Sequence, residues 1–338
     1  PPFYVSLFNG KSSIGEDFWI ERKEEEMKFK RALERYQKGH RGGIMFLGER
    51  NMGKTAFCKY LSQVYLKNQP VYSIFPPLSG SILENDFSDI LSKATQQQGD
   101  VFQAVNQLKE NSVIIVNDLE LFWERSKEGL CIIKLIEKLI DEFSHKLMVI
   151  VNLNPYAYKV INQLTNLGEH FIEIISLKPF DAEELKELIM RRHRSSGLSF
   201  RFNKNIGQVN EIRMAQFFNA CFNYSEGNPG TALFSWLANI KKVNADNLVI
   251  EKPEYPSLSG LKSLNEEWLM LLGQFIIHKR MDQAKIIRIT GWDVKETVEI
   301  ILAMSRSGII MEKVSGLYMI DPYMHPFVVK VLRDMNVI

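Results

Sequence analysis

A loop between an apolar run and a helical pattern constrains this chain more than any other feature. The segment Gly48-Glu49-Arg50-Asn51-Met52-Gly53-Lys54-Thr55 fits GxxxxGK[ST], follows the apolar run Gly43–Leu47 and opens a helix predicted over 55–66. Backbone amides of such a loop, together with the N-terminus of the following helix, can surround phosphate groups. The loop therefore predicts a nucleoside triphosphate site, for which we expect ATP with Mg²⁺.

Individual loop residues have expected roles. Lys54 should reach the β and γ phosphates, and the hydroxyl of Thr55 should coordinate Mg²⁺. A glycine-containing turn that carries Lys-Thr by chance is the alternative, and the flanking strand and helix argue against it. The predicted cofactor-binding residues here are Gly48, Glu49, Arg50, Asn51, Met52, Gly53, Lys54, Thr55 and the following Ala56.

The apolar runs around this loop predict an α/β domain over residues 19–179. Five runs are mostly continuous rather than alternating, which is typical of parallel strands buried on both faces: 43–47, 71–75, 112–116, 147–153 and 171–175. Helical patterns lie between or before them, at 24–37, 55–66, 87–94 and 131–143. Residues 1–18 contain Asn9-Gly10, Ser12-Ser13 and Gly15 without periodicity, so we expect a leader or linker there.

Two smaller domains are predicted after Pro179. Residues 180–250 show helical patterns at 182–194, 209–223 and 231–241, which predicts an all-α domain. The last predicted domain, residues 251–338, begins with a stretch rich in proline and serine. Helices predicted at 266–278, 283–289 and 294–305 precede two apolar runs separated by Ser315-Gly316, an order typical of a winged helix.

Composition narrows the class of protein but not its chemistry. The 338 residues are 24% charged and 45% hydrophobic with a net charge of +2, which suits a globular protein without a dominant field. Three widely spaced cysteines indicate neither disulfides nor zinc. With no apolar run of about 18 residues and no signal peptide, we expect no membrane segment and a cytoplasmic location. Because the chain begins Pro1-Pro2-Phe3, we expect it to be part of a longer protein.

A second motif follows the apolar run 112–116, where Asn117, Asp118 and Glu120 come in succession. Acids after such a strand are expected to hold magnesium and to polarise the attacking water. Two registers are open. Either Asn117 takes the metal-shell place and Asp118 acts as base, or Asp118 serves the metal and Glu120 acts as base. Asp118 belongs to the site in both.

These motifs together resemble the AAA+ ATPases, and within them the branch shared by origin-licensing ATPases and the signal-transduction STAND ATPases. The segment from Trp19 to Glu25 is similar to the hhGRExE box of that branch, although Glu21 and Lys23 depart from it. The resemblance implies that Ile20 lies against adenine and that Arg22 belongs to the nucleotide site. The segment 148–155 is similar to a sensor-1 strand, whose polar residue would be Asn154, or alternatively Asn152.

The resemblance also implies that residues 180–250 form a lid. The segment from Gly227 to Leu233 is similar to the GxP box of STAND lids, which places Pro229 over adenine, and it lacks the sensor-2 arginine of origin-type relatives. Many AAA+ rings carry an arginine that reaches a neighbour's nucleotide. The nearest candidates for this role are Arg191, Arg192 and Arg194.

The predicted winged helix has a poor surface for DNA. The first turns of its third helix, 293–299, carry one positive and three negative side chains. The basic residues Lys279, Arg280, Lys285 and Arg288 are the candidates for contacts with a DNA backbone. We therefore favour a protein-facing or autoinhibitory role, with DNA as the alternative.

Our leading hypothesis is a molecular switch in which ATP or ADP lies between sheet and lid. Its exchange or hydrolysis would change how lid and winged helix pack and would control a protein partner or self-association. Hydrolysis is expected to be slow because Asn117 stands where a metal-binding acid is usual. The alternatives are a DNA-handling ATPase and a nucleotide-binding scaffold without hydrolysis.

Overall fold

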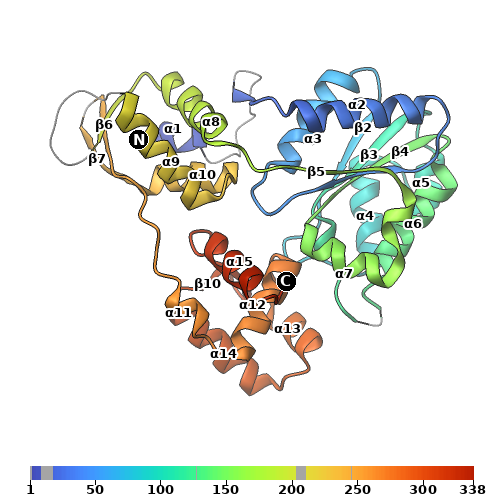
Figure 1. Ribbon diagram of the computed structural model, residues 1–338. Helices are drawn as coiled ribbons and strands as arrows, with labels where there is room; N and C mark the ends of the chain where they lie inside the picture. The colour runs from blue at the N-terminus through green and yellow to red at the C-terminus, as the bar shows by residue number, and fades with distance from the viewer. Residues whose placement is uncertain (1, 9–17, 127, 203–210, 245) are drawn as a thin grey trace.

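The computed structural model describes residues 2–8, 18–126, 128–202, 211–244 and 246–338. Most of these residues fall into a core region (19–179), a middle region (180–250) and a C-terminal region (251–338), which Figure 1 shows at upper right, upper left and bottom. The turn signals Asn9-Gly10, Ser12-Ser13 and Gly15, and the predicted helix start at Val209, lie outside the described residues.

The core region contains a five-stranded parallel sheet in the order β2-β3-β4-β1-β5. Its strands are β1 (Gly43–Leu47), β2 (Val71–Ile74), β3 (Ser112–Val116), β4 (Leu147–Leu153) and β5 (Phe171–Ser176). β1, β3 and β4 are buried along their whole length, as continuous apolar strands covered on both faces should be. The predicted α/β fold with a parallel sheet is confirmed, and the loops after β1, β3 and β4 meet at one edge.

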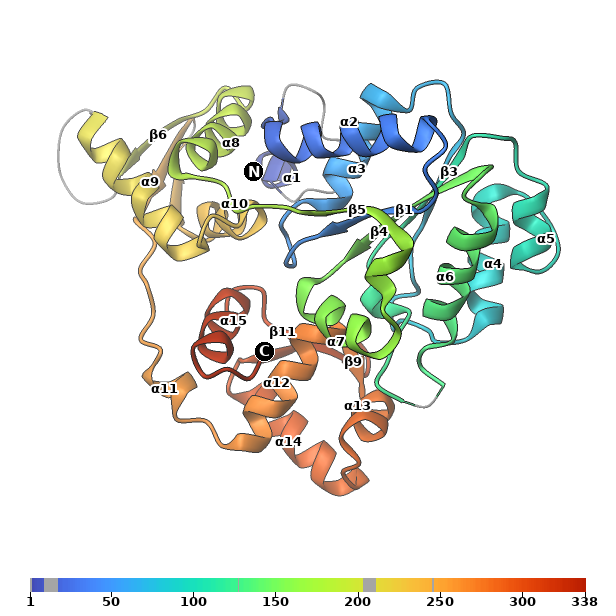
Figure 2. The same cartoon turned by 45° about the vertical axis from the view of Figure 1, so that its right-hand side comes forward.

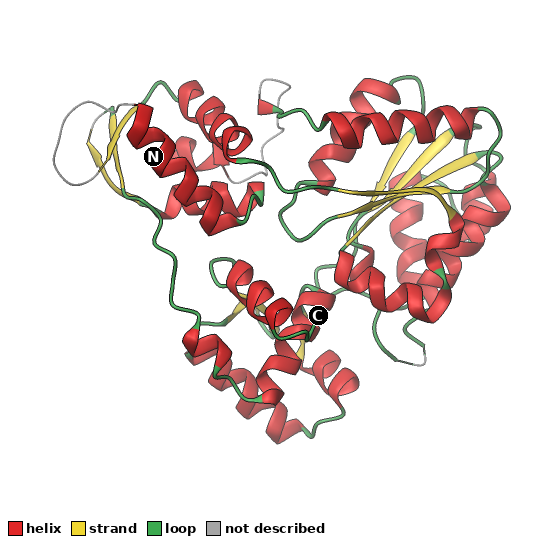
Figure 3. Cartoon of the chain, viewed as in Figure 1, coloured by secondary structure: helices red, strands yellow, loops and turns green. Residues whose placement is uncertain are grey.

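Helices cover both faces of this sheet (Figure 3). One face packs against α2 (Lys23–Gln37) and α3 (Lys54–Tyr65). The other carries α4 (Glu84–Thr95), α5 (Val101–Asn106), α6 (Cys131–Phe143) and α7 (Pro155–Thr165), with the short 3-10 helices η2 (Leu119–Leu121) and η3 (Leu167–His170). Side chains of β1 alternate between the two cores, since Phe46 faces α3 and Met45 faces the opposite side.

The segment 1–18, expected to be a leader or linker, contains a helix. Pro2–Phe8 form α1, whose Tyr4 and Phe8 are buried against the middle region. The Tyr4 hydroxyl is hydrogen-bonded to His193 Nδ1 (3.0 Å) and accepts from Trp236 Nε1 (2.7 Å). Tyr4 and Phe8 are one helical turn apart, a spacing that is typical of a helix. The turn residues that follow obscured this pattern in the sequence.

The middle region contains the three predicted helices and, in addition, a small sheet. The helices are α8 (Ala182–Ser195), α9 (Glu211–Ser225) and α10 (Pro229–Ala238). The strands β6 (Ser199–Phe202), β7 (Ile240–Asn244) and β8 (Asn247–Ile250) pair in the order β6-β8-β7. The expectation of an all-α composition was thus incomplete. These strands are short and largely exposed except for β8, so their sequences lack a strong apolar pattern.

The C-terminal region has the element order expected of a winged helix. After α11 (Ser259–Lys262) come α12 (Glu266–His278), β9 (Met281–Asp282), α13 (Gln283–Thr290), α14 (Val294–Arg306), the hairpin β10 (Ile310–Val314) and β11 (Leu317–Ile320), and α15 (His325–Asp334). β9 pairs with β11 as a third strand. α12 packs against α7 and η2 of the core region, as Figure 2 shows for α7. No helix within the described residues has the length and apolarity needed to cross a bilayer.

Candidate nucleotide-binding site

A cavity of about 440 Å³ lies where all three regions meet. Most of the predicted site residues line it, namely Ile20, Arg22, Arg50, Asn51, Met52, Gly53, Lys54, Thr55, Ala56, Asp118, Glu120 and Pro229. Gly48, Glu49, Asn117 and Asn154 are not among its lining residues. The fold therefore brings segments that are distant in the sequence to one cavity at the edge of the sheet.

The phosphate loop curls around the amino group of Lys54. Asn51 (φ 67°) and Gly53 (φ 90°) adopt left-handed conformations that turn the loop into α3. Lys54 is buried and donates hydrogen bonds to the carbonyls of Gly48 and Glu49, the second at 3.2 Å. Burial lowers the pKa of Lys54, while the charges of Glu120 and Asp118 oppose this shift. The ammonium thus stands inside the loop, where it can exchange carbonyl oxygens for phosphate oxygens.

Asn117 stands beside the hydroxyl predicted to coordinate magnesium. Its Oδ1 accepts from Thr55 Oγ1 (3.2 Å) and from Asn152 Nδ2 (2.8 Å), and the residue is buried. This contact puts Asn117 in the metal-shell place of the first register, and Asp118, which lines the cavity with Thr55, can serve the metal as in the second, so both registers stay open. Because an amide carries no charge, this place offers less to a cation than an aspartate would.

The two acids of the site differ in their electrostatics. Asp118 Oδ2 lies 2.6 Å from Lys279 Nζ of the C-terminal region. Burial tends to raise the pKa of Asp118, but the charge and hydrogen bond of Lys279, with Lys54 and Arg280, hold it below its ordinary value. Glu120 is buried, and burial together with the charge of Asp118 raises its pKa. Asp118 is therefore paired with a cation and has a lowered pKa, whereas the pKa of Glu120 is raised.

Asn154 does not line the cavity. Its side chain caps α7 by accepting from the amide of Tyr156 (2.9 Å) and donates to the carbonyl of Ile276 in α12 (2.8 Å). The alternative sensor residue, Asn152, is buried and donates a hydrogen bond to Asn117. It does not line the cavity either. The position of Asn154 after a strand correctly predicted the edge of the sheet at which it lies. Its side chain, however, caps the helix that begins at Pro155.

The residues present fit Mg²⁺ only in company with a nucleotide. Thr55 and Asp118 line the same cavity and would hold the ion together with phosphate oxygens. Magnesium is commonly bound through one or two carboxylates, substrate phosphates and water. The part of the chain that the structure describes contains no group of three or more His, Cys, Asp or Glu residues that could hold a metal ion alone.

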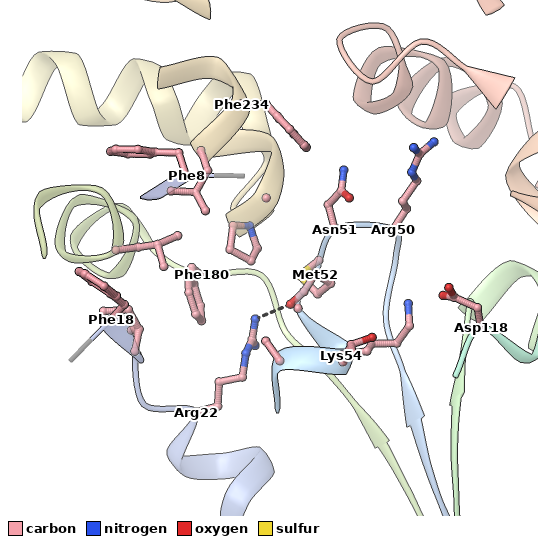
Figure 4. Close-up of a pocket in the computed structure, with 18 of the residues that line it drawn as sticks. Phe8, Phe18, Arg22, Arg50, Asn51, Met52, Lys54, Asp118, Phe180 and Phe234 are labelled. Atoms are coloured by element: carbon pink, nitrogen blue, oxygen red, sulfur yellow. Dashed lines mark hydrogen bonds between the residues drawn. The ribbon is translucent and has the colours of Figure 1, made fainter. Parts of the chain in front are cut away.

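The end of the cavity away from Lys54 and Asp118 is apolar and aromatic. Figure 4 shows Phe8, Phe18 and Phe180 at that end. Arg192 of α8 also lines the cavity, with its guanidinium 5.5 Å from the centre of the Phe18 ring. Arg192, one of the candidates for an arginine that reaches a neighbour's nucleotide, therefore faces the cavity of its own chain. Phe8, Phe18 and Phe180 were missed because their segments carry no motif.

Arg22 fastens three segments of the cavity wall to one another. Its guanidinium donates to the carbonyls of Met52 (3.0 Å) and Lys178 (2.8 Å) and lies 4.3 Å from the centre of the Phe180 ring. The first of these bonds is drawn in Figure 4. Since one of these carbonyls belongs to the phosphate loop, Arg22 positions that loop.

The middle region touches the phosphate loop through the start of α10. Asn228 Nδ2 donates to the carbonyl of Arg50 (2.8 Å), and the amide of Gly230 donates to the carbonyl of Asn51 (3.1 Å). A Cβ atom at Gly230 would lie 2.6 Å from Asn51 Cβ and 2.8 Å from its carbonyl oxygen. Only glycine permits this approach, which puts Pro229 at the cavity.

Gly230→Ala should therefore weaken nucleotide binding roughly tenfold, because overpacking of this kind costs about 1–3 kcal/mol and would push the middle region off the loop. Gly260→Ala is the matched control, since a Cβ there meets nothing within 4 Å. Calorimetric titration with ADP compares the two variants. Equal affinities would show that this contact does not shape the site.

The C-terminal region supplies basic residues to this site and to the surface beside it. Lys279, Arg280 and Lys313 line the cavity. Arg280 donates to the carbonyl of Leu78, Lys285 to that of Trp123 (3.1 Å), and Arg288 forms two 3.0 Å bonds to Glu124. All four residues considered for DNA thus contact the core region. This docking was not predictable from the sequence, because each residue alone is typical of a solvated helix surface.

The comparisons with known proteins identify the fold. No family model and no curated protein matches the sequence. The solved structures of Cdc6p from Pyrobaculum aerophilum (TM-score 0.51) and of the Aeropyrum pernix ORC2 protein in ADPNP-ADP complexes (TM-score 0.54) each match at 11% identity over 98% of both chains. The RuvB Holliday junction branch migration motor of Thermotoga maritima matches at 15% identity over 94% of this chain and 95% of that one, with a TM-score of 0.43. At such identities the first two matches show the AAA+ ATPase fold and no more.

Proposed function

We propose that this chain is an ATP-binding molecular switch of the STAND kind, in which residues 19–179, 180–250 and 251–338 are the nucleotide-binding, lid and winged-helix domains. The observation that carries the proposal is the ion pair between Lys279 and Asp118, which joins the C-terminal region directly to the predicted catalytic acid. Nucleotide in the cavity would thereby control whether the C-terminal region stays docked.

The shape and lining of the cavity support a nucleotide as ligand. Its volume of about 440 Å³ falls within the usual range of small-molecule sites, roughly 300–1,000 Å³. An aromatic end suits a base, and the loop with Lys54 at the other end suits phosphates. The ORC2 protein of the same fold was solved in ADPNP-ADP complexes, which supports ATP and ADP as the ligands here.

The proposed reaction is slow attack of water on the γ phosphate. Lys54 would stabilise the charge that develops on the phosphate, and Asp118 would orient the water. Two observations favour low turnover in the docked arrangement. Asn117 is neutral beside Thr55, and the Asp118 carboxylate is engaged by Lys279.

The alternative, a DNA-handling ATPase, is less well supported by the docked arrangement. Lys279, Arg280, Lys285 and Arg288 all contact the core region. The start of α14 presents Glu296 and Glu299, which would repel a phosphate backbone. A protein partner or a second copy of the chain is therefore the proposed target of the released C-terminal region.

Calorimetry with ATP and ADP, with steady-state hydrolysis measured with and without duplex DNA at several salt concentrations, tests the proposal. The switch predicts binding and slow turnover that DNA leaves unchanged. Strong, salt-sensitive stimulation by DNA would establish the alternative, because phosphate contacts weaken steeply as salt rises. Binding with no turnover under any condition would indicate a scaffold.

The stability of the folded protein should also be sensitive to acid. The fully buried His278 stacks on Trp123, with ring centres 4.8 Å apart. Burial, and secondarily the charge of Lys285, lower the pKa of His278 well below its ordinary value. The folded protein therefore keeps His278 neutral, while the unfolded chain takes up a proton below pH of about 6.5. Stability must fall as the pH drops, by about 1.4 kcal/mol per unit.

In His278→Phe this contribution is absent. Between pH 7 and pH 5 the wild type should lose roughly 2 kcal/mol more urea stability than the variant. His40→Gln, at an exposed position, is the control and should behave as the wild type. Parallel pH profiles for wild type and His278→Phe would contradict the buried, neutral state of this imidazole.

A further inference from the structure

The ion pair between Asp118 and Lys279 is built on two unusual backbone positions. Asp118 is left-handed (φ 49°, ψ 51°), and Lys279 follows α12 with φ 65° and ψ −45°. The amide of Arg280 donates to the carbonyl of His278 (2.6 Å), which closes a tight turn around Lys279. Non-glycine residues rarely take positive φ, and turns of this sign are strained. Strained backbone positions are common at functional sites. Here they place the Lys279 ammonium against the Asp118 carboxylate.

The charges around this pair favour phosphates even without a metal ion. Asn117 is neutral, Asp118 is compensated by Lys279, and Glu120 is the second acid that lines the cavity. Arg50 and Lys54 line the same cavity as these acids. Burial, and then the nearby charge of Arg280, lower the pKa of Arg50 to about 10, so it remains charged at neutral pH. The phosphate end thus carries an excess of positive charge from the chain itself.

We propose that Lys279 is a phosphate-site cation that takes the place of Mg²⁺ at Asp118, so that the docked arrangement binds a nucleoside diphosphate without metal. This rests on the proposed nucleotide switch. Mg²⁺ bound at about 2.1 Å to the Asp118 oxygen that accepts from Lys279 at 2.6 Å would bring two cations close together, and their repulsion disfavours joint occupancy. Metal with a triphosphate and Lys279 are therefore alternatives at this carboxylate.

This competition links the metal to the position of the C-terminal region. Lys279 directly follows α12, whose His278 and Ile276 contact Trp123 and Asn154 of the core region. Displacing its ammonium removes one anchor of that helix from the core region. Binding of Mg²⁺ with a triphosphate would in this way favour release, whereas a metal-free diphosphate would favour docking.

Titration calorimetry with ADP, in MgCl₂ and in EDTA, tests this role. Wild-type affinity should differ less than twofold between the two buffers. In Lys279→Gln, Asp118 is left uncompensated, so affinity in EDTA should fall about tenfold and recover in MgCl₂, as expected for one buried charge-assisted contact. Lys295→Gln, an 87% exposed side chain on α14, is the matched control and should match the wild type. Thermal melting checks that each variant is folded.

The outcomes separate this inference from the proposed function. If wild type and Lys279→Gln both bind ADP with the same dependence on Mg²⁺, Lys279 does not replace the metal, and the nucleotide site stands. Absence of ADP and ATP binding by the wild type in both buffers would overturn the nucleotide site and this role together.

Discussion

Lys54→Ala should abolish nucleotide binding, with affinity for ATP and ADP at least about 100-fold weaker than in the wild type. The buried ammonium is enclosed by the phosphate loop, so its removal takes away the cation that would contact the β and γ phosphates. Loss of a charge at a desolvated phosphate site costs roughly 3 kcal/mol, which corresponds to this factor. Calorimetric titration with each nucleotide measures the loss.

Lys59→Ala is the matched control for this variant, because Lys59 lies on the same helix but is exposed. It should retain wild-type affinity. Nucleotide binding by Lys54→Ala at wild-type strength would mean that the cavity binds its ligand elsewhere than at the loop.

Arg288→Ala should release the C-terminal region from the core region. Glu124 is 2% exposed and accepts two hydrogen bonds from Arg288, each 3.0 Å long. Burial tends to raise the pKa of Glu124, and Arg288 reverses this to a net lowering. An unpaired buried carboxylate costs about 3–5 kcal/mol. Because the side chain of Arg288 is 50% exposed, we expect about 2 kcal/mol, or roughly 30-fold more of the released form.

Hydrogen exchange of the α12 and α13 amides should accelerate accordingly in Arg288→Ala, and ATP turnover should rise because Asp118 is freed more often. Lys295→Ala removes an exposed cation of α14 and should change neither quantity. Unchanged exchange in Arg288→Ala would show that docking does not depend on this pair.

The sheet was predictable because its strands are buried on both faces. β1, β3 and β4 have the predicted bounds, and α6 coincides with its predicted range. The strands β6 and β7 were not predictable in the same way, since their side chains are mostly in contact with solvent. Local sequence shows burial of an element on both faces more clearly than partial burial.

The candidate site was predictable where a motif holds a local structure and not where distant segments meet. The loop residues Arg50 to Ala56 line the cavity as a contiguous set. Phe8 and Lys279 reach it from opposite ends of the chain. Asn154 shows the converse case, because local capping of α7 determines its position more strongly than its place after a strand.

Hydrogen exchange of α12 and α13 in the wild type, compared between ADP without metal and a non-hydrolysable ATP analogue with Mg²⁺, tests the central claim most directly. The switch predicts slow exchange with ADP and faster exchange in the same helices with the Mg²⁺-bound analogue, because Lys279 must leave Asp118. Identical exchange in the two states, with both ligands shown to be bound, would contradict control of docking by the nucleotide.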